Sequence, residues 1–343
     1  MNLQIALLLG QDGLTSGAVY ALLALSLVLV FSVTRVLLVP QGEFVTFGAL
    51  TMAGLQAGKP AALAALLLGA TLLQALLGAW RALRHGQRPG ARLLAMPAYA
   101  AALLAMVHTL PLAKLPMGAQ AVLTLALVVP FGPLLYDLVF RPVASASSLV
   151  LLIVSIAVHA VLVGSSLLMF GPDGARTEPF SEAGLELGPV TLNAQTLWVL
   201  VLSLALVGAL YAFFERSLYG KALRATAVHR LGAQLMGISP SLAGQASFAL
   251  AAFIGALSGI LIAPITTLYF DSGFMICLKG FVGAILGGLA SYPLAAAGAL
   301  GVGLTESFST FWASDHKEVL VFTLILPVLL WRSLTTRHQE GDA

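Results

Sequence analysis

The sequence predicts an all-α protein, a polytopic transmembrane helical bundle with about 9–11 membrane segments. The first observation is composition, since 59% of the 343 residues are hydrophobic, 9% are charged, and the mean hydropathy is +0.98. The second is that charge-poor runs of roughly 20 residues, the length a helix needs to cross about 30 Å of hydrocarbon, recur along the whole chain. A water-soluble fold is therefore excluded, and no stretch is polar enough or long enough for a separate catalytic or nucleotide-binding domain.

The apolar runs and the polar residues between them predict the membrane segments in order along one membrane domain, residues 1–343. Segment 41–57 contains Glu43, and segment 274–290 is rich in glycine and contains Lys279, so either can be broken or re-entrant instead of a full crossing. The predicted segments lie near 14–33, 41–57, 61–80, 93–113, 119–140, 149–170, 195–214, 243–265, 274–290, 294–311 and 318–334.

The charges between these segments predict the orientation. Alternating sides along the chain collects most of the 17 basic residues on one face, which the positive-inside rule makes cytoplasmic. The N-terminus is then outside and the C-terminus in the cytoplasm, and a net charge of +3 does not point to nucleic acid. The basic face has Arg35, Arg81, Arg84, Arg88, Arg92, Arg141, Arg216, Lys221, Arg224, Arg230, Arg332 and Arg337; the other has Asp12, the polar loop 171–194 with Asp173, Glu178, Glu182 and Glu186, then Asp271, Asp315 and Glu318.

Small residues predict where helices touch. Gly13 with Gly17, Gly255 with Gly259, and Gly283 with Gly287 repeat the GxxxG spacing, which serves either packing within the chain or a subunit interface. His108 and His159 lie in apolar segments without carboxylate or cysteine partners at ligand spacing, which favours neutral, hydrogen-bonded imidazoles. We expect no metal site, and no set of residues has the pattern of an enzyme active site.

Segment 215–239 is a basic amphipathic stretch in a chain that otherwise avoids charge. Leu223, Ala227, Leu231 and Leu235 recur every four residues and predict a packing face, while Lys221, Arg224 and Arg230 lie elsewhere on the surface. Gly237 is placed to end a helix, and Ser239-Pro240 to cap and begin the next. These features predict a short helical hairpin or kinked helix along the membrane surface, which either docks a partner or holds anionic lipid.

Several motifs, in order along most of the chain, resemble the permease subunits of branched-chain amino acid ABC importers of the LivH type. Gly13-Leu-Thr-Ser-Gly resembles the family's opening helix, Gln41-Gly-Glu its His-Gly-Glu signature, and Phe140-Arg-Pro-Val its Tyr-Arg-Pro-Val turn. Leu278-Lys-Gly-Phe through the glycine run to Pro293, followed by Thr305-Glu-Ser and His316-Lys-Glu-Val, resembles the family's C-terminal part.

The resemblance implies the fold of an ABC importer permease in the bacterial inner membrane. It also implies transport by alternating access, with segment 215–239 as the cytoplasmic loop that couples the permease to the ATPase. It implies four kinds of partner besides the lipid bilayer: a second, LivM-like permease, two ABC ATPase subunits and an extracytoplasmic binding protein that meets loop 171–194. The chain has no Walker A pattern, so ATP and Mg²⁺ are expected on the partner ATPases and no cofactor on this chain. The residues that match the coupling loop are Glu215, Arg216, Gly220, Lys221, Arg224, Ala225, Gly237 and Ile238.

Charged residues inside the bilayer are costly, so Glu43, Lys279 and Glu306 are candidates for function or structure, together with Gln41 and Gly42 of the same signature. We hypothesise an ion pair between Glu43 and Lys279, serving either structure or gating of the substrate path. A solvated connector is the alternative for loop 171–194.

The chain also departs from the family pattern. Gln41 replaces the signature histidine, Leu294 follows Pro293 in place of glycine, and Trp331-Arg-Ser replaces the terminal Pro-Thr-Gly. Region 61–118 is longer than usual by two apolar segments, which reads as a helical insertion that leaves the downstream orientation unchanged. A permease for urea or short amides, or an ion-coupled secondary transporter, remains an alternative to an amino acid permease.

Overall fold

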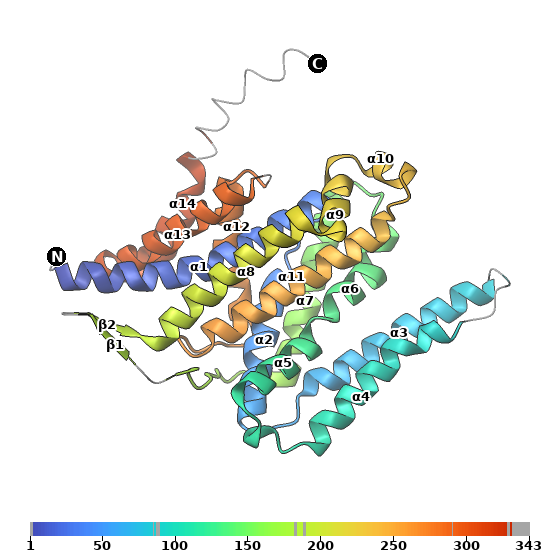
Figure 1. Ribbon diagram of the computed structural model, residues 1–343, viewed down its shortest axis with the longest axis horizontal. Helices are drawn as coiled ribbons and strands as arrows, with labels where there is room; N and C mark the ends of the chain where they lie inside the picture. The colour runs from blue at the N-terminus through green and yellow to red at the C-terminus, as the bar shows by residue number, and fades with distance from the viewer. Residues whose placement is uncertain are drawn as a thin grey trace, which may run out of the picture. The chain divides into compact units, whose positions relative to one another are not determined.

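A computed structural model describes residues 3–84, 86, 90–181, 184–187, 190–289, 291–327 and 330. The predicted Arg88, Glu182, Arg332, Arg337 and the Trp331 motif lie outside these residues. Helices dominate the described part of the chain (Figure 1), which confirms the all-α fold. Among the described residues, six helical stretches are long and apolar enough to cross a membrane.

The predicted membrane segments correspond to helix where the structure describes them, and the end of segment 318–334 lies outside the described residues. Helix α1 begins at Leu3, well before the predicted start near residue 14. The helices are α1 Leu3–Thr34, α2 Gln41–Gln56, α3 Ala62–Arg84, α4 Ala95–Thr109, α5 Met117–Val128, α6 Phe131–Leu135, α7 Ser148–Phe170, α8 Ala194–Arg216, α9 Leu218–Val228, α10 Arg230–Leu235, α11 Pro240–Ile262, α12 Ser272–Leu286, α13 Tyr292–Trp312 and α14 Lys317–Thr323. Short 3₁₀ turns cover Ala91–Leu94, Leu112–Lys114, Arg141–Val143 and Ser314–His316, and a π-helical turn covers Tyr136–Phe140.

The two segments that were doubtful as full crossings form short helices. Helix α2 has 16 residues and α12 has 15. At 1.5 Å per residue they are about 24 and 23 Å long, which is less than the roughly 30 Å of hydrocarbon. Neither helix spans the bilayer core by itself.

Two predicted segments have more detail than the sequence indicated. The single helix expected over 119–140 ends at Val128 and continues as α6 after Pro130, whose ring cannot supply a helical N–H. Loop 171–194, for which no secondary structure was predicted, contains an antiparallel hairpin of β1 Gly184–Leu187 and β2 Val190–Asn193.

The chain divides into two compact units. One contains Met1–Val28, Ser181–Tyr211 and Met275–Ala343, and the other contains Leu29–Phe180 and Ala212–Phe274. In the first unit, α1 and α12 both pack on α13. A Cβ added at Gly13 would lie 2.8 Å from Leu304 Cα, and one at Gly283 would lie 2.7 Å from Ala299 Cα.

In the second unit, α2 is the buried central helix and packs most extensively against α11. A Cβ added at Gly48 would lie 2.8 Å from Ala256 Cα, and one at Gly259 would lie 3.0 Å from Ala49 N. The predicted glycine pairs of both units therefore serve helix packing within this chain. The fully buried phenylalanines of the second unit are Phe44, Phe47, Phe140 and Phe248.

Candidate functional site

Segment 215–239 forms two short helices, α9 and α10, with a sharp bend at His229 (Figure 1). Ser217 begins α9, since its Oγ accepts from the Gly220 N–H at 2.9 Å. His229 leaves the helical conformation, and its Nδ1 accepts from the Gly232 N–H at 2.7 Å. Gly237 turns the chain at φ 83°. This confirms the predicted kinked helical segment and its glycine stop.

The start of α11 matches the prediction in position but not in detail. Ser239 occupies the N-cap position and Pro240 the first turn. The Ser239 side chain makes no capping hydrogen bond, so the proline alone marks this helix start.

The entry to α9 requires a glycine. A Cβ added at Gly220 would lie 2.7 Å from Phe214 Cα, at the end of α8. Arg224 secures the same junction, because its Nη1 donates to Glu215 Oε1 at 2.7 Å and its Nη2 donates to the Phe214 carbonyl. That carbonyl is in the last turn of α8, where helix carbonyls lack partners. Arg224 therefore ties α9 to α8, and its guanidinium is engaged inside the chain.

The predicted packing face of segment 215–239 is only partly right. Leu223 is buried, but Leu231 is 62% exposed and Leu235 is 81% exposed. The bend at His229 interrupts the helix, so the four-residue periodicity of α9 does not continue into α10. We call the large, mostly exposed apolar side chains of the segment the apolar crest; they are Leu218, Tyr219, Val228, Leu231, Leu235 and Met236.

The remaining coupling candidates lie around this crest. Arg216, Lys221 and Ala225 are exposed. Gly237 and Ile238 line an apolar groove of about 650 Å³ between α9 and α11. Its other walls include Phe213, Tyr219, Ala222, Leu223, Leu242, Ala246, Leu250 and Phe253.

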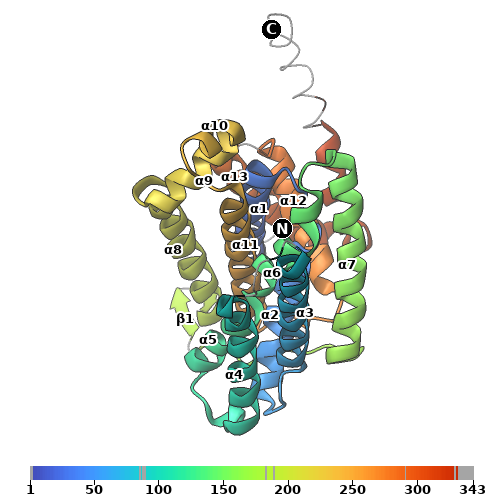
Figure 2. The same cartoon turned by 90° about the vertical axis from the view of Figure 1, so that its right-hand side faces the viewer.

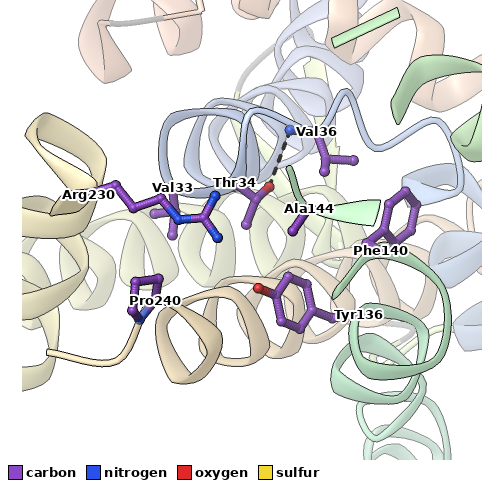
Figure 3. A pocket seen from close by; sticks show the side chains of 8 residues that line it. All are labelled: Val33, Thr34, Val36, Tyr136, Phe140, Ala144, Arg230 and Pro240. Atoms are coloured by element: carbon purple, nitrogen blue, oxygen red, sulfur yellow. Dashed lines mark hydrogen bonds between the residues drawn. The ribbon is translucent and has the colours of Figure 1, made fainter. Parts of the chain in front are cut away.

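A small pocket joins segment 215–239 to the rest of the second unit (Figure 3). Arg230 extends from α10 towards Thr34 at the end of α1, and Tyr136 points towards the pocket from the π-helical turn. The Tyr136 ring fills the space where a Cβ at residue 244 would stand, so Gly244 of α11 is required for this contact. Sequence reasoning did not identify Tyr136 or Gly244.

Asp137, in the same π-helical turn, connects three parts of the second unit. Its Oδ2 accepts from Gln74 Nε2 of α3 at 3.0 Å and from Gln245 Nε2 of α11 at 2.6 Å. Its Oδ1 lies 3.6 Å from Arg141 Nη1. π-Helical turns often occur at functional sites. The sequence feature that could have pointed to Asp137 is an acidic residue near the end of an apolar run, four residues before Arg141.

Inside the second unit, Glu43 pairs with His159. Glu43 Oε1 lies 2.7 Å from His159 Nδ1, and the Glu43 side chain is fully buried. Glu43 Oε2 and Gln41 Oε1 have no hydrogen-bond partner within the described residues, although Gln41 Nε2 donates to the Ala251 carbonyl at 2.9 Å. The Phe274 ring centroid lies 4.5 Å from that of His159. His159 thus has a carboxylate partner 116 positions away, which the spacing of residues in the sequence did not indicate. Within the described residues, the one hydrogen bond of the His108 ring is to the Leu104 carbonyl, at 2.9 Å.

Inside the first unit, Lys279 pairs with Glu306. Lys279 Nζ donates to Glu306 Oε1, and Tyr20 Oη donates to Glu306 Oε2 at 2.7 Å. The hypothesised pair of Glu43 with Lys279 is therefore wrong, because each charge has another partner in its own unit. The signature residues Gln41, Gly42 and Glu43 stay together, and Gly42 packs against Gly273.

The segments that connect the helices of the second unit gather at its two opposite ends, as the alternating topology predicts. One end gathers the end of α1, the π-helical turn and α10. The other end is held by three contacts: Gln56 Oε1 accepts from the Glu178 N–H at 2.9 Å, Arg176 Nε donates to the Pro264 carbonyl at 2.8 Å, and Ala175 bridges to Leu268. Which end faces the cytoplasm stays a prediction from charge.

Comparison with known proteins adds the following similarities. Residues 90–329 match the family described as branched-chain amino acid transport system permease component. The chain is 34% identical over 145 residues to the high-affinity branched-chain amino acid transport system permease protein LivH of Escherichia coli K12 and to that of Salmonella typhimurium LT2. This match covers 41% of the chain and 46% of each LivH, so the chain spans about half the length of these relatives. It is 26% identical over 239 residues to BraD of Pseudomonas aeruginosa, covering 67% of the chain and 77% of BraD. No solved structure matches.

Proposed function

Since the chain belongs to the family of branched-chain amino acid transport system permease components, we propose that it is the membrane-spanning subunit of an ABC importer for branched-chain or other hydrophobic amino acids. The observation that carries this proposal is the match over residues 90–329, which includes segment 215–239 and α11 to α13. The relatives LivH and BraD are both named as permeases of high-affinity branched-chain amino acid systems. The apolar interior and the membrane-length helices agree with a multi-pass membrane protein.

In this proposal the energy comes from other chains. Two ABC ATPase subunits bind and hydrolyse ATP with Mg²⁺, a second, LivM-like permease completes the membrane path, and an extracytoplasmic binding protein delivers substrate. Closure of the ATPases moves segment 215–239, and the permease alternates between inward-open and outward-open states.

The geometry of segment 215–239 suits such a lever. Gly220 allows α9 to lie directly on the end of α8, and Arg224 ties the two helices together. Gly237 directs the chain into α11. A push on α9 or α10 is thereby transmitted to α8 and α11, because the joints are short and braced.

The apolar crest supports a specific docking mode. Leu231 and Leu235 of α10 and Met236 at its C-cap are at least 62% exposed, whereas Arg224 is engaged within the chain. We assign the main ATPase contact to the crest, with exposed Arg216 and Lys221 at its basic rim, and the role of an internal brace to Arg224. Burial of these large apolar side chains would supply the docking energy.

The buried polar pairs act on the membrane side of this lever. Glu43 with His159 joins α2 to α7, and Lys279 with Glu306 joins α12 to α13. We propose that both pairs hold helices in register during transport, and that Gln41 and Gly42 set the start of the short helix α2 next to Gly273.

Transport assays of the assembled complex in proteoliposomes test the function. We expect uptake of labelled leucine that requires ATP and the binding protein, that is competed by isoleucine and valine, and that survives dissipation of ion gradients. Competition by urea or acetamide instead would indicate that the substrate is urea or a short amide. Uptake that ignores ATP but stops when ion gradients are removed would overturn the ABC assignment.

A pair of variants tests the docking mode. Leu235→Asp is expected to reduce ATP-driven uptake at least tenfold, because it places a charge on a surface that must lose water on docking. Gln234→Glu, on the neighbouring exposed residue, adds the same charge and is expected to stay within about twofold of the original protein. Equal uptake by the two variants would contradict docking through the crest.

A further inference from the structure

The α3–α4 hairpin presents an exposed apolar surface that ends in a basic cluster. Only the first half of α3 is buried, through Leu63, Ala64, Leu67 and Thr71. Leu76 is 67% exposed and Leu83 is 65% exposed in its second half. Figures 1 and 2 show α3 and α4 side by side along their lengths. In a membrane protein, exposed leucines on such a helix suit contact with lipid tails.

At the end of α3, an aromatic ring and two arginines stand together. The Arg84 guanidinium lies 4.1 Å from the Trp80 ring centroid, and Trp80 is 51% exposed. Arg81 and Arg84 are both exposed. Tryptophan is favoured at the headgroup level of a bilayer, and a stacked guanidinium can still offer paired N–H donors to a phosphate.

Among the described residues, no ion pair neutralises Arg81 or Arg84. The sequence contains no Asp or Glu between Glu43 and Asp137. The cluster is therefore a patch of uncompensated positive charge beside an exposed apolar surface.

The position of α3 in the second unit sets the membrane level of the cluster. Gln74 donates to Asp137, which places this part of α3 next to the π-helical turn, at the end of the unit that also holds α10. Trp80 follows Gln74 by six residues, or about 9 Å further along the helix. The cluster thus lies at the end predicted to be cytoplasmic, where anionic lipids attract basic residues.

We propose that Trp80, Arg81 and Arg84 form a binding site for the headgroup of an anionic phospholipid, with Leu76 and Leu83 beside its acyl chains. The cluster precedes residue 90, where the match to the permease family begins. The site would anchor the α3–α4 hairpin at the cytoplasmic headgroup level.

Native mass spectrometry of the purified full-length chain with phosphatidylglycerol tests the site. Near a membrane surface each basic residue contributes about 1 kcal/mol, so Arg81→Gln with Arg84→Gln is expected to weaken the tightest phosphatidylglycerol binding by roughly 30-fold. Trp80→Leu keeps both charges and is expected to weaken it several-fold, because the guanidinium loses its stacking surface. Phosphatidylcholine, with a neutral headgroup, is expected to bind weakly to every form.

A matched control separates this site from general charge effects. Lys59→Gln with Lys114→Gln removes the same charge from exposed positions at the other end of the α3–α4 hairpin and is expected to leave the tightest binding unchanged. An equal loss in this control, unchanged binding in the Arg81 and Arg84 variant, or release of the lipid by excess inorganic phosphate would each overturn the proposal. The proposal would also be overturned if the Arg81 and Arg84 variant bound lipid normally but no longer associated with the second permease, because the cluster would then be a protein interface. Arg84→Lys, which preserves the charge, serves if the double variant does not fold.

Discussion

Glu43 and Glu306 are carboxylates inside a membrane protein, and each is held by a different kind of partner. Glu306 accepts from Lys279 and from Tyr20. Glu43 has one oxygen on His159 and one without a hydrogen-bond partner in the described residues. A buried charge is costly unless it is paired, so the imidazole contact is the main compensation available to Glu43.

Removal of His159 therefore tests the importance of this pair. His159→Leu is expected to destabilise the protein by about 3–5 kcal/mol, because it leaves Glu43 buried without its partner. Replacing both residues by leucine is expected to recover part of that loss. Thermal unfolding of the detergent-solubilised protein measures both effects.

The control is a double-mutant cycle between Glu43 and Lys279. These residues share no partner, so Glu43→Gln and Lys279→Gln are expected to combine additively, within about 0.5 kcal/mol. A larger coupling there, with none between Glu43 and His159, would restore the ion pair that the sequence suggested and contradict the pairing described above.

At the scale of elements, glycine decides how closely α2 approaches α11. Gly48 and Gly259 let the two backbones touch, and α2 is the most buried helix of the second unit. Close approach allows van der Waals contact along both helices, which is the main attraction between helices in lipid. The position of α2 in turn sets where Glu43 and Gln41 lie.

Two glycines of α2 provide a matched test. Gly48→Ala is expected to cost about 1–3 kcal/mol, since its Cβ would lie 2.8 Å from Ala256 Cα and force the helices apart. Gly54→Ala meets no atom within 4 Å and is expected to be neutral or to stabilise by up to about 1 kcal/mol through helix propensity. Melting temperatures of the two variants measure the difference, and equal values would argue against backbone contact at Gly48.

At the scale of the whole molecule, the charges along the sequence and the contacts at the ends of the second unit agree. Thr34, Tyr136 and Arg230 meet at one end, while Gln56 contacts Glu178 at the other. The basic connections collect at the first end. The positive-inside rule then places that end, with segment 215–239, in the cytoplasm.

Site-directed labelling measures this orientation. Cys277 is the single cysteine of the chain and is buried, so Cys277→Ser gives a suitable background. We expect Lys221→Cys to react with a membrane-impermeant maleimide only in inside-out vesicles, and Glu178→Cys only in intact spheroplasts. Both positions are exposed. The reverse pattern would invert the topology and remove the ATPase contact proposed for segment 215–239.

The sequence by itself determined the helical membrane fold, the family, the exceptional character of the segments that form α2 and α12, and the kinked form of segment 215–239. These properties depend on local composition, on residue spacing and on glycine or proline at single positions. Only the tertiary structure decided the partners of Glu43, Lys279, Arg224 and Asp137, and the exposure of Leu231 and Leu235. Glu43 and His159 are 116 positions apart, and Gln245 and Asp137 are 108 apart. Such contacts follow from how helices pack, and a one-dimensional pattern of hydrophobicity and charge does not encode which helix faces which.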